Sequence, residues 1–205
     1  MGQFITFEGI DGSGKSTQAR LLAALFRDDA IDHVLTREPG GSPGAELIRA
    51  LLVEGDPGRW SPETECLLFT AARRDHWERT ILPALDRGAH VISDRFADST
   101  RVYQGAARKD LRATVDRLHD LMIGREPDLT FVIDMDPAAA LQRGLARQSG
   151  EDRFEDMGLS FQEKLRAGFL ALAAEYRDRC TVIDGTGAPA EVAAQVSAVI
   201  EAHGL

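Results

Sequence analysis

Gly9-Ile10-Asp11-Gly12-Ser13-Gly14-Lys15-Ser16-Thr17 is the stretch of this sequence that decides its fold class. It matches the phosphate-binding loop pattern G-x-x-x-x-G-K-[ST], and it lies between a short apolar segment and a longer helical pattern. The glycines allow backbone N–H groups to converge on a phosphate, and the dipole of the following helix favours negative charge there. A chance glycine turn would match in on the order of one chain in a hundred. In such a loop, Lys15 bridges the β- and γ-phosphates of a nucleotide and Ser16 supplies a hydroxyl ligand to Mg²⁺.

The loop indicates a nucleotide ligand but not a reaction. Small GTPases share the loop and also require a guanine-reading segment of the Asn-Lys-x-Asp kind. The chain contains no Asn, so that segment is absent and ATP is the expected nucleotide. The residues predicted to bind ATP are Gly9, Ile10, Asp11, Gly12, Ser13, Gly14, Lys15, Ser16 and Thr17.

Short apolar segments alternate with longer helical patterns along the chain, which predicts a parallel sheet with helices on both faces. The expected strands are residues 4–8, 33–36, 89–93, 129–134 and 181–183. The expected helices are residues 15–27, 43–52, 62–86, 110–123, 137–147, 160–179 and 190–203. We therefore predict an α/β fold of the three-layer P-loop NTPase type, with a five-stranded parallel sheet and a short lid. The chain is expected to be a single domain, residues 1–205, with the lid at about 143–156.

The composition of the chain indicates which kinds of partner it can bind and in which cellular compartment it is located. The net charge of −9 is unfavourable for binding nucleic acid, because phosphate backbones require a basic surface. The sequence has no stretch of 18 uncharged apolar residues and no signal-peptide pattern at its N-terminus. Cys66 and Cys180 lie far apart without metal-ligand spacing, which favours reduced thiols. We expect a cytoplasmic protein that binds neither nucleic acid nor membranes.

Three further segments fall where a parallel sheet places its ligands, beyond the strand ends or on a facing helix. They are Arg37-Glu38-Pro39-Gly40-Gly41, Phe69-Thr70-Ala71-Ala72-Arg73-Arg74 and Asp94-Arg95-Phe96-Ala97-Asp98-Ser99-Thr100-Arg101-Val102-Tyr103-Gln104-Gly105. Asp94 can accept hydrogen bonds from Mg²⁺-bound water, so we assign it to a metal site with Ser16. The alternative role for Asp94 is a helix N-cap. The planar fork of Arg95 suits phosphate oxygens.

Together with the phosphate loop, these segments resemble the thymidylate kinase family, whose members transfer a phosphoryl group from ATP to dTMP. The resemblance covers nearly the whole chain, and its Arg-Glu-Pro-Gly-Gly and Asp-Arg-Phe-x-x-Ser-x-x-x-Tyr-Gln segments are far more specific than the loop. It implies ATP and dTMP as substrates, Mg²⁺ as cofactor and a homodimer. Two alternatives stay open: a kinase of another nucleoside monophosphate or of a deoxynucleoside, and a nucleotide-binding regulator without transfer activity.

The resemblance also implies contacts with the acceptor base. Phe69 and Arg73 lie four residues apart and so share one helix face. In the family pattern, Phe69 stacks on thymine and Arg73 contacts the base or its phosphate. Without the resemblance, an aromatic ring at this spacing is more often core than ligand. Thr100 and Gln104 can donate and accept hydrogen bonds at the base edge.

Other implied contacts involve the sugar and the phosphate. Arg49 resembles the arginine that grips the monophosphate, and its alternative is an ordinary surface arginine. Tyr103 lies beneath C2′ in the family pattern and would exclude a ribose hydroxyl, whereas its alternative is a packing role. Asp11 contacts the sugar 3′-OH or a phosphate-binding arginine, or only its own turn. Arg95 lies near the transferring group. The full set predicted to bind dTMP is Asp11, Glu38, Arg49, Phe69, Arg73, Arg95, Ser99, Thr100, Tyr103 and Gln104.

An arginine is expected over the bridge between the β- and γ-phosphates, where charge develops during phosphoryl transfer. Some family members carry it in the phosphate loop, at the position that Gly12 occupies here. The candidates are then the lid arginines, although nearby acids such as Glu151 could instead pair them on a solvated face. The sequence does not choose between the three. The predicted catalytic set is Lys15, Arg95, Arg143, Arg147 and Arg153.

Overall fold

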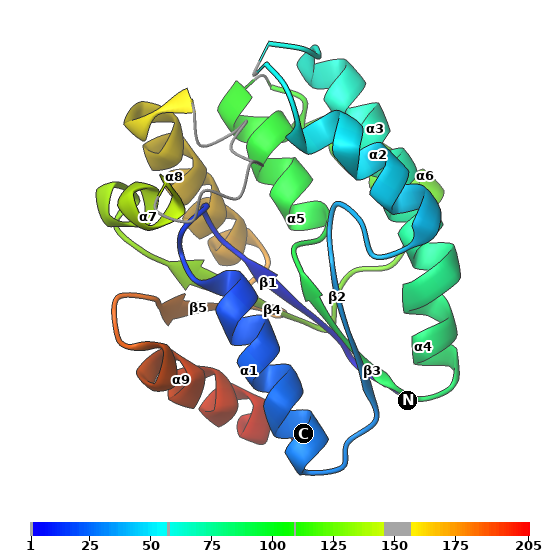
Figure 1. Ribbon diagram of the computed structural model, residues 1–205, viewed down its shortest axis with the longest axis vertical. Helices are drawn as coiled ribbons and strands as arrows, with labels where there is room; N and C mark the ends of the chain where they lie inside the picture. Colours follow the sequence, from blue (N-terminus) through cyan, green and yellow to red (C-terminus); the bar gives the residue numbers. More distant parts are fainter. Residues whose placement is uncertain (1, 57, 109, 146–156) are drawn as a thin grey trace.

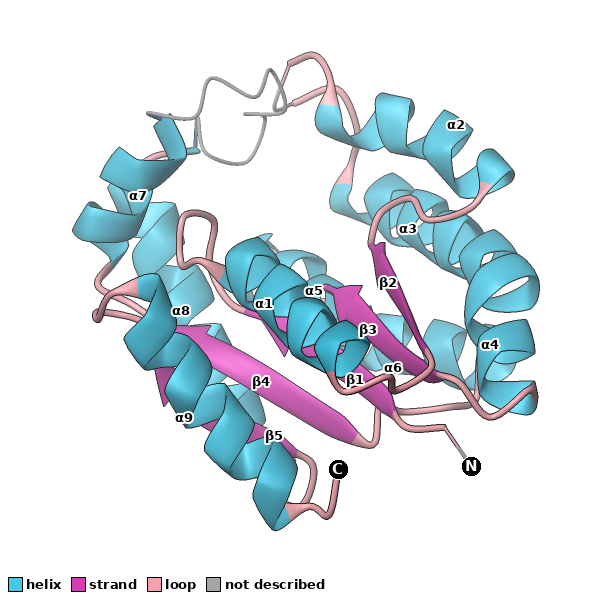
Figure 2. Ribbon diagram, turned by 60° about the horizontal axis from the view of Figure 1, so that its bottom comes forward, coloured by secondary structure: helices cyan, strands magenta, loops and turns pink. Residues whose placement is uncertain are grey.

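The computed structural model describes residues 2–56, 58–108, 110–145 and 157–205. Within these residues, five strands form one parallel sheet in the order β2-β3-β1-β4-β5 (Figure 1). The strands are β1 (Phe4–Glu8), β2 (His33–Arg37), β3 (His90–Asp94), β4 (Leu129–Asp134) and β5 (Cys180–Asp184). Figure 2 shows the sheet as the middle layer, with helices on both of its faces.

Two helices cover one face of the sheet, α1 (Lys15–Asp28) and α9 (Pro189–Ala202). The other helical elements lie on the opposite face or beyond the edges of the sheet. They are α2 (Pro43–Val53), α3 (Pro62–His76), η1 (Trp77–Ile81), α4 (Leu82–Asp86), α5 (Ala97–Thr100), η2 (Arg101–Arg108), α6 (Arg112–Met122), α7 (Pro137–Leu145) and α8 (Leu159–Glu175).

The core follows from the alternation of side chains along each strand. Ile5 and Phe7 point to the face covered by α1 and α9, where Phe7 stacks on Phe131 with ring centroids 5.1 Å apart. Phe4 points to the other face and packs edge-on against Phe96. β1 is buried on both faces along its whole length, although it includes the polar Thr6 and Glu8, and it holds the phosphate loop at a fixed place.

The predicted alternation of strands and helices is present, and its boundaries differ mostly by one or two residues. Residues 62–86 form three consecutive elements, α3, η1 and α4, in which η1 is a π-helical segment. This wider segment precedes Pro83, whose ring leaves no room for the carbonyl of a regular preceding turn. The expected helix at 160–179 ends at Glu175, because the backbone N–H groups of Arg179 and Cys180 both donate to the Tyr176 carbonyl and turn the chain into β5.

The helical region formed by α5 and η2 was not predicted from the sequence. The chain enters α5 through Arg95, whose φ of 73° is positive although it is not a glycine. Such a backbone conformation gives no sequence signal of a helix start. The missed region carries four of the predicted dTMP-binding residues, Ser99, Thr100, Tyr103 and Gln104.

Within the part of the chain that the structure describes, no helix combines the length and apolar character needed to cross a membrane. Cys66 and Cys180 are buried, and both are free thiols.

Candidate functional site

The phosphate loop joins β1 to α1 and is shaped by glycines in left-handed conformations. A side-chain carbon at Gly12 would lie 1.9 Å from the carbonyl oxygen of Ala140, so a larger residue would clash with α7. This contact explains why an arginine could not stand at position 12 without a shift of the backbone. Gly14 begins α1 with φ 100°, and a side-chain carbon there would meet no atom within 4 Å. The N-terminus of α1 therefore faces open space where an anion can approach.

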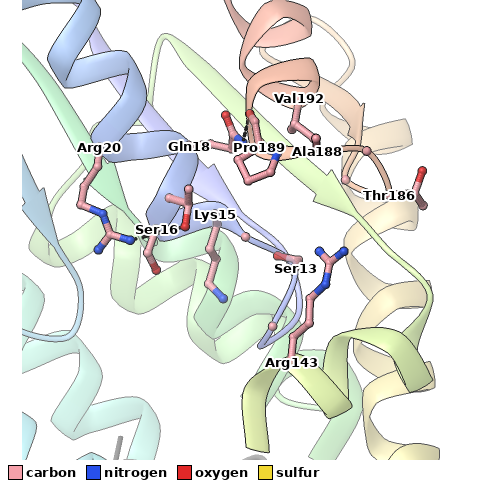
Figure 3. Close-up of a pocket in the computed structure, with 15 residues that line it drawn as sticks. Ser13, Lys15, Ser16, Gln18, Arg20, Arg143, Thr186, Ala188, Pro189 and Val192 are labelled. Atoms are coloured by element: carbon pink, nitrogen blue, oxygen red, sulfur yellow. Dashed lines mark hydrogen bonds between the residues drawn. The ribbon is translucent and has the colours of Figure 1, made fainter. Parts of the chain in front are cut away.

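A first cavity of about 640 Å³ lies against this loop (Figure 3). Its lining comes from the loop, α1, α7, the segment after β5 and the start of α9: Gly12, Ser13, Gly14, Lys15, Ser16, Thr17, Gln18, Arg20, Arg143, Gly185, Thr186, Gly187, Ala188, Pro189 and Val192. The predicted ATP-binding residues 12–17 all line it. Gly9 and Ile10 instead lie behind the loop, where their carbonyl oxygens accept hydrogen bonds from Arg95 and Lys15.

The segment 185–189 is part of the first cavity that the sequence analysis did not identify. It follows β5, and Gln18 of α1 holds it by donating from Nε2 to the Pro189 carbonyl at 3.0 Å (Figure 3). The rule that ligands lie beyond the carboxyl ends of parallel strands could have found it. Its residues carry no charged or aromatic side chain that would mark a site.

A second cavity of about 220 Å³ adjoins the loop on its other side and shares Lys15 and Ser16 with the first. All ten residues predicted to bind dTMP line this second cavity. Its complete lining is Asp11, Lys15, Ser16, Arg37, Glu38, Pro39, Arg49, Val53, Phe69, Arg73, Asp94, Arg95, Phe96, Ser99, Thr100, Tyr103 and Gln104. Residues from five separate parts of the sequence thus meet in one place, as the clustering of the motifs predicted.

Arg95, Asp11 and Tyr103 form a connected group at the floor of the second cavity. The Arg95 guanidinium donates to Asp11 Oδ1 at 2.5 Å and to the Tyr103 hydroxyl at 3.1 Å. The Tyr103 hydroxyl in turn donates to Asp11 Oδ2 at 2.7 Å. Burial alone would raise the pKa of Asp11, but the charges of Arg95 and Lys15 lower it well below its ordinary value. Burial raises the pKa of Tyr103, so its hydroxyl stays protonated and donates.

Lys15 lies between the two cavities and is directed by the loop itself. Its Nζ donates to the Ile10 carbonyl at 3.1 Å and lies 3.3 Å from Asp11 Oδ1. Burial and the charge of Arg95 lower the pKa of Lys15, while Asp11 and Asp94 oppose that shift. These neighbours hold a cation at the point where the two cavities meet.

Asp94 ends β3 beside the loop, in register with Phe7 of β1. Its Oδ1 is buried and has no hydrogen-bond partner among the described residues. The same residues contain no group of three or more His, Cys, Asp or Glu side chains that could hold a metal ion. Mg²⁺ prefers oxygen ligands and usually keeps several waters beside substrate phosphates. Asp94 and Ser16 both line the second cavity, so the unpartnered carboxylate oxygen and the hydroxyl fit magnesium bound together with a nucleotide.

Arg73 extends from α3 to the second cavity, and several hydrogen bonds fix its guanidinium. It donates through Nε to Glu38 Oε2 at 2.7 Å and through Nη2 to Thr100 Oγ1 at 2.9 Å. His76 holds the other oxygen of Glu38, with its Nδ1 3.0 Å from Oε1. Burial favours the neutral form of Glu38, but Arg73 and His76 lower its pKa overall. Glu38 thus orients Arg73, and His76 is a supporting residue that the sequence analysis did not identify.

Arg49 and Phe69 complete the cavity from α2 and α3. The Arg49 Nη1 donates to the Pro39 carbonyl at 2.5 Å, which ties α2 to the segment after β2. Phe69 lines the cavity together with Arg73, so the two residues do share one helix face. By contrast, Arg74 points away and pairs with Glu78 on the exposed side of the helix.

Glu8 is a buried acid behind the site that the sequence analysis assigned only to a strand. It accepts hydrogen bonds from the Phe96 backbone N–H at 2.7 Å and from the Ser99 hydroxyl at 2.6 Å. The Ser99 oxygen accepts from Arg95 at 2.8 Å. Burial and the neighbouring Asp98 raise the pKa of Glu8 to about 7. Glu8 thereby supports the start of α5 and, through Ser99, the position of Arg95.

Of the three predicted lid arginines, Arg143 is placed by the structure. It lies in α7, lines the first cavity and points toward the loop near Ser13 (Figure 3). Arg147 and Arg153 lie outside the described residues, as does most of the expected lid, residues 146–156.

The parallel sheet, the phosphate loop and two cavities that meet at its lysine define a P-loop kinase. The sequence model of the thymidylate kinase family matches residues 7–196. A thymidylate kinase of Dinoroseobacter shibae is 74% identical over 96% of this chain and 95% of its own. One of Caulobacter vibrioides is 52% identical over 97% of this chain and 96% of its own. The crystal structure of thymidylate kinase from Ehrlichia chaffeensis superposes with a TM-score of 0.80, at 37% identity over 97% of this chain and 98% of that chain. The chain belongs to the thymidylate kinase family.

Proposed function

We propose that this chain transfers the γ-phosphoryl group of ATP to dTMP, with ATP in the first cavity and dTMP in the second. Membership of the thymidylate kinase family supports ATP as donor and dTMP as acceptor. The observation that carries the assignment of the cavities is that Lys15 and Ser16 line both of them. A donor phosphate on one side of the loop and an acceptor phosphate on the other would then meet at one lysine.

In this proposal, the reaction needs no covalent nucleophile on the protein. An oxygen of the dTMP phosphate attacks the γ-phosphorus of ATP in line, and ADP leaves. The chain contributes positioning and charge neutralisation, which are the main sources of catalysis in phosphoryl transfer. Lys15 and Arg95 neutralise charge on the donor and acceptor phosphates, and Asp11 and Tyr103 fix the Arg95 guanidinium. Phe69, Arg73, Thr100 and Gln104 bind the base, and Arg49 binds the monophosphate.

We assign Mg²⁺ to the Ser16 hydroxyl and to Asp94, whose Oδ1 lacks a partner among the described residues. When bound, the ion neutralises charge on the donor phosphates. Chelation by EDTA should abolish ADP release, and added Mg²⁺ should restore it. Asp94→Asn should raise the Mg²⁺ concentration needed for half-maximal activity. An unchanged magnesium requirement in that variant would mean that Asp94 has only a structural role.

A coupled assay of ADP release tests the function directly. We expect ADP release that depends on dTMP, with kcat/KM for dTMP above the values for AMP, GMP and CMP. A better acceptor among those three would indicate a kinase of another monophosphate. Release with thymidine but not with dTMP would indicate a deoxynucleoside kinase. Nucleotide binding without any transfer would indicate a regulator.

The chain is proposed to be a single domain whose lid, residues 143–156, brings an arginine over the phosphates. An arginine over the transferring group is typically worth about 10³–10⁵ in kcat. At least one of Arg143→Ala, Arg147→Ala and Arg153→Ala should therefore lower kcat by about a thousandfold, with a far smaller change in dTMP affinity. If all three variants keep kcat within about tenfold of the wild-type value, the positive charge over the transferring group comes from Arg95 or Lys15 instead.

We also propose a homodimer in the cytoplasm. Large apolar side chains are exposed on α2, α3 and α6, with Leu47 76%, Leu67 59% and Leu121 74% exposed. Light scattering should give the mass of two chains, and Leu121→Asp should shift it toward one. Leu25→Asp, on the other side of the sheet, is the control. A wild-type mass of one chain would contradict the dimer, and recovery of the protein outside the cytoplasmic fraction would contradict the location.

A further inference from the structure

Gln104 and Glu65 form a buried pair at the edge of the second cavity. Gln104 belongs to η2 and lines the cavity, while Glu65 belongs to α3 and stands behind it. Both side chains are fully buried. The Gln104 Nε2 donates to Glu65 Oε2 at 3.0 Å. The Gln104 Oε1 is buried and has no hydrogen-bond partner among the described residues.

Glu65 restricts which atom of the Gln104 amide is available to a ligand. A primary amide carries donors on nitrogen and an acceptor on oxygen, and a rotation by half a turn exchanges them. A carboxylate only accepts hydrogen bonds, so the Gln104 nitrogen must face Glu65. The oxygen is then the part of the amide that remains for a ligand. A buried acceptor without a partner is costly, so a ligand that supplies an N–H there gains affinity.

We propose that Glu65 is a positioning residue that selects the acceptor base by fixing the orientation of the Gln104 amide. This inference rests on the proposed function, in which the second cavity holds dTMP. The fixed amide oxygen accepts a hydrogen bond from a base that carries N–H at ring position 3, as thymine does. Cytosine has a lone pair at that position, so two acceptors would face each other. A site built to hydrogen-bond a substrate group can reject the analogue lacking it by large factors.

The test compares dTMP with 5-methyl-dCMP, because these nucleotides differ only at ring positions 3 and 4. The readout is the ratio of their kcat/KM values. Glu65→Gln supplies an amide that can donate to Gln104 Oε1, so the Gln104 nitrogen is free to turn toward the base. We expect this variant to lower the ratio by about tenfold or more. Glu63→Gln, an exposed substitution on the same helix, should leave the ratio unchanged.

A merely structural role would give a different result. If Glu65→Gln lowers kcat/KM equally for both nucleotides, the ratio stays constant and the proposal is wrong. The action through Gln104 is tested in a second background, Gln104→Ala, where adding Glu65→Gln should change the ratio no further. A further tenfold change there would also overturn the proposal.

Two wild-type measurements keep the test decisive if Glu65→Gln does not fold. Calorimetry should give a Kd for dTMP about tenfold or more below that for 5-methyl-dCMP. Equal Kd values would overturn the inference. ADP release by the wild-type protein with dTMP reports on the proposed function separately. If the wild-type protein releases no ADP with dTMP, the proposed function is wrong. If it releases ADP but the two Kd values are equal, only the proposed role of Glu65 is wrong.

Discussion

Arg95 is the residue on which most of the contacts in the site converge. Its backbone has φ 73°, a conformation that is unusual for a residue with a side chain. Such strain persists where the surrounding structure fixes it, and it often occurs at functional sites. Here the Arg95 N–H donates to the Phe7 carbonyl, while its guanidinium contacts Asp11, Ser99 and Tyr103. This backbone conformation directs the Arg95 guanidinium to the floor of the second cavity.

Tyr103 combines two roles that can be separated by substitution. Its ring packs edge-on against Phe161 and Phe169, and its hydroxyl joins Arg95 to Asp11. Tyr103→Phe should keep the preference for dTMP over its ribonucleotide, because the ring still fills the space. It should lower kcat/KM by about tenfold or more, because hydrogen bonds to charged groups are lost. Steady-state kinetics with both nucleotides provide the measurement.

The matching variant Tyr103→Ala removes the ring as well as the hydroxyl. It should relax discrimination against the ribonucleotide, since the space for a 2′-OH opens. If the ratio for the two nucleotides does not change in a folded variant, Tyr103 is a packing residue only.

Glu8 should make stability depend on pH. Its pKa rises from its ordinary 4.5 to about 7 in the fold, so the folded state binds the proton more tightly than the unfolded state. The stabilisation is fully present below the unfolded pKa and is lost as the pH rises through the folded pKa. The difference in Tm between wild type and Glu8→Gln should therefore fall from about pH 5 to about pH 8. The measurement is thermal unfolding at a series of pH values, with the exposed Glu163→Gln as control. A difference that grows with pH would show the opposite linkage.

At the scale of elements, the key unit is α5 with η2, because it presents four of the side chains predicted to bind dTMP to the second cavity. A cluster of ion pairs around Asp98 and Arg101 holds this unit in place. Arg101 donates to Asp98 Oδ1 at 2.8 Å and to Glu126 Oε1 at 2.5 Å. Arg179, next to β5, donates to Asp98 Oδ2 at 2.6 Å. The cluster ties the helical unit to the start of β5, which is an edge strand of the sheet. The adjacent Ser99 and Thr100 line the second cavity.

Removing Asp98 should reveal the strength of this attachment. Asp98 is 1% exposed, so Asp98→Ala leaves two buried guanidinium groups without that partner. Loss of one partner from a buried ion pair typically costs about 3–5 kcal/mol of unfolding free energy. Asp28→Ala, in an exposed pair with Arg27, should cost less than about 1 kcal/mol. Urea denaturation of both variants measures these values. Equal losses would mean that the cluster does not anchor α5 and η2.

At the scale of the whole molecule, the parallel sheet decides where the two cavities lie. The carboxyl ends of its strands meet at one edge, and the loop after β1 stands between the segments after β3 and β5. The chain carries a net charge of −9, yet arginines from β2, α2, α3, α7 and the end of β3 reach this edge. The sheet therefore concentrates positive charge locally in an acidic protein.

A ligand that spans both cavities should bind more tightly than either nucleotide. Adenosine and thymidine joined through their 5′ oxygens by five phosphates would occupy both sides of the loop. Linking two ligands makes the second binding event intramolecular, which raises affinity by about 10²–10⁴. The compound should raise the Tm above that of an equal mixture of ATP and dTMP. A diadenosine compound of the same length is the control. Equal shifts for the two compounds would contradict the placement of dTMP in the second cavity.

Local patterns in the sequence were enough to determine the fold class and the phosphate loop. This is because a phosphate loop needs glycines and a lysine at fixed spacing, and buried parallel strands need continuous apolar runs. Most of the residues around the second cavity were predicted from the resemblance to the thymidylate kinase family. The ten residues predicted to bind dTMP do surround one cavity, because each lies just after a strand or on a facing helix. Arg147 and Arg153 stay predictions, since they lie outside the described residues.

Only the tertiary structure decided how these side chains are held. Glu8, Glu65 and His76 are buried residues that bear an acid or an imidazole group. Their roles depend on partners 38 to 91 positions away in the sequence. No local pattern predicts such contacts, because burial and charge pairing are set by the packing of distant elements. The positive φ of Arg95, the start of α5 and the segment 185–189 beside the loop likewise result from packing. The sequence alone thus determined which chemical groups are present, and the fold determined which atoms of those groups face the two cavities.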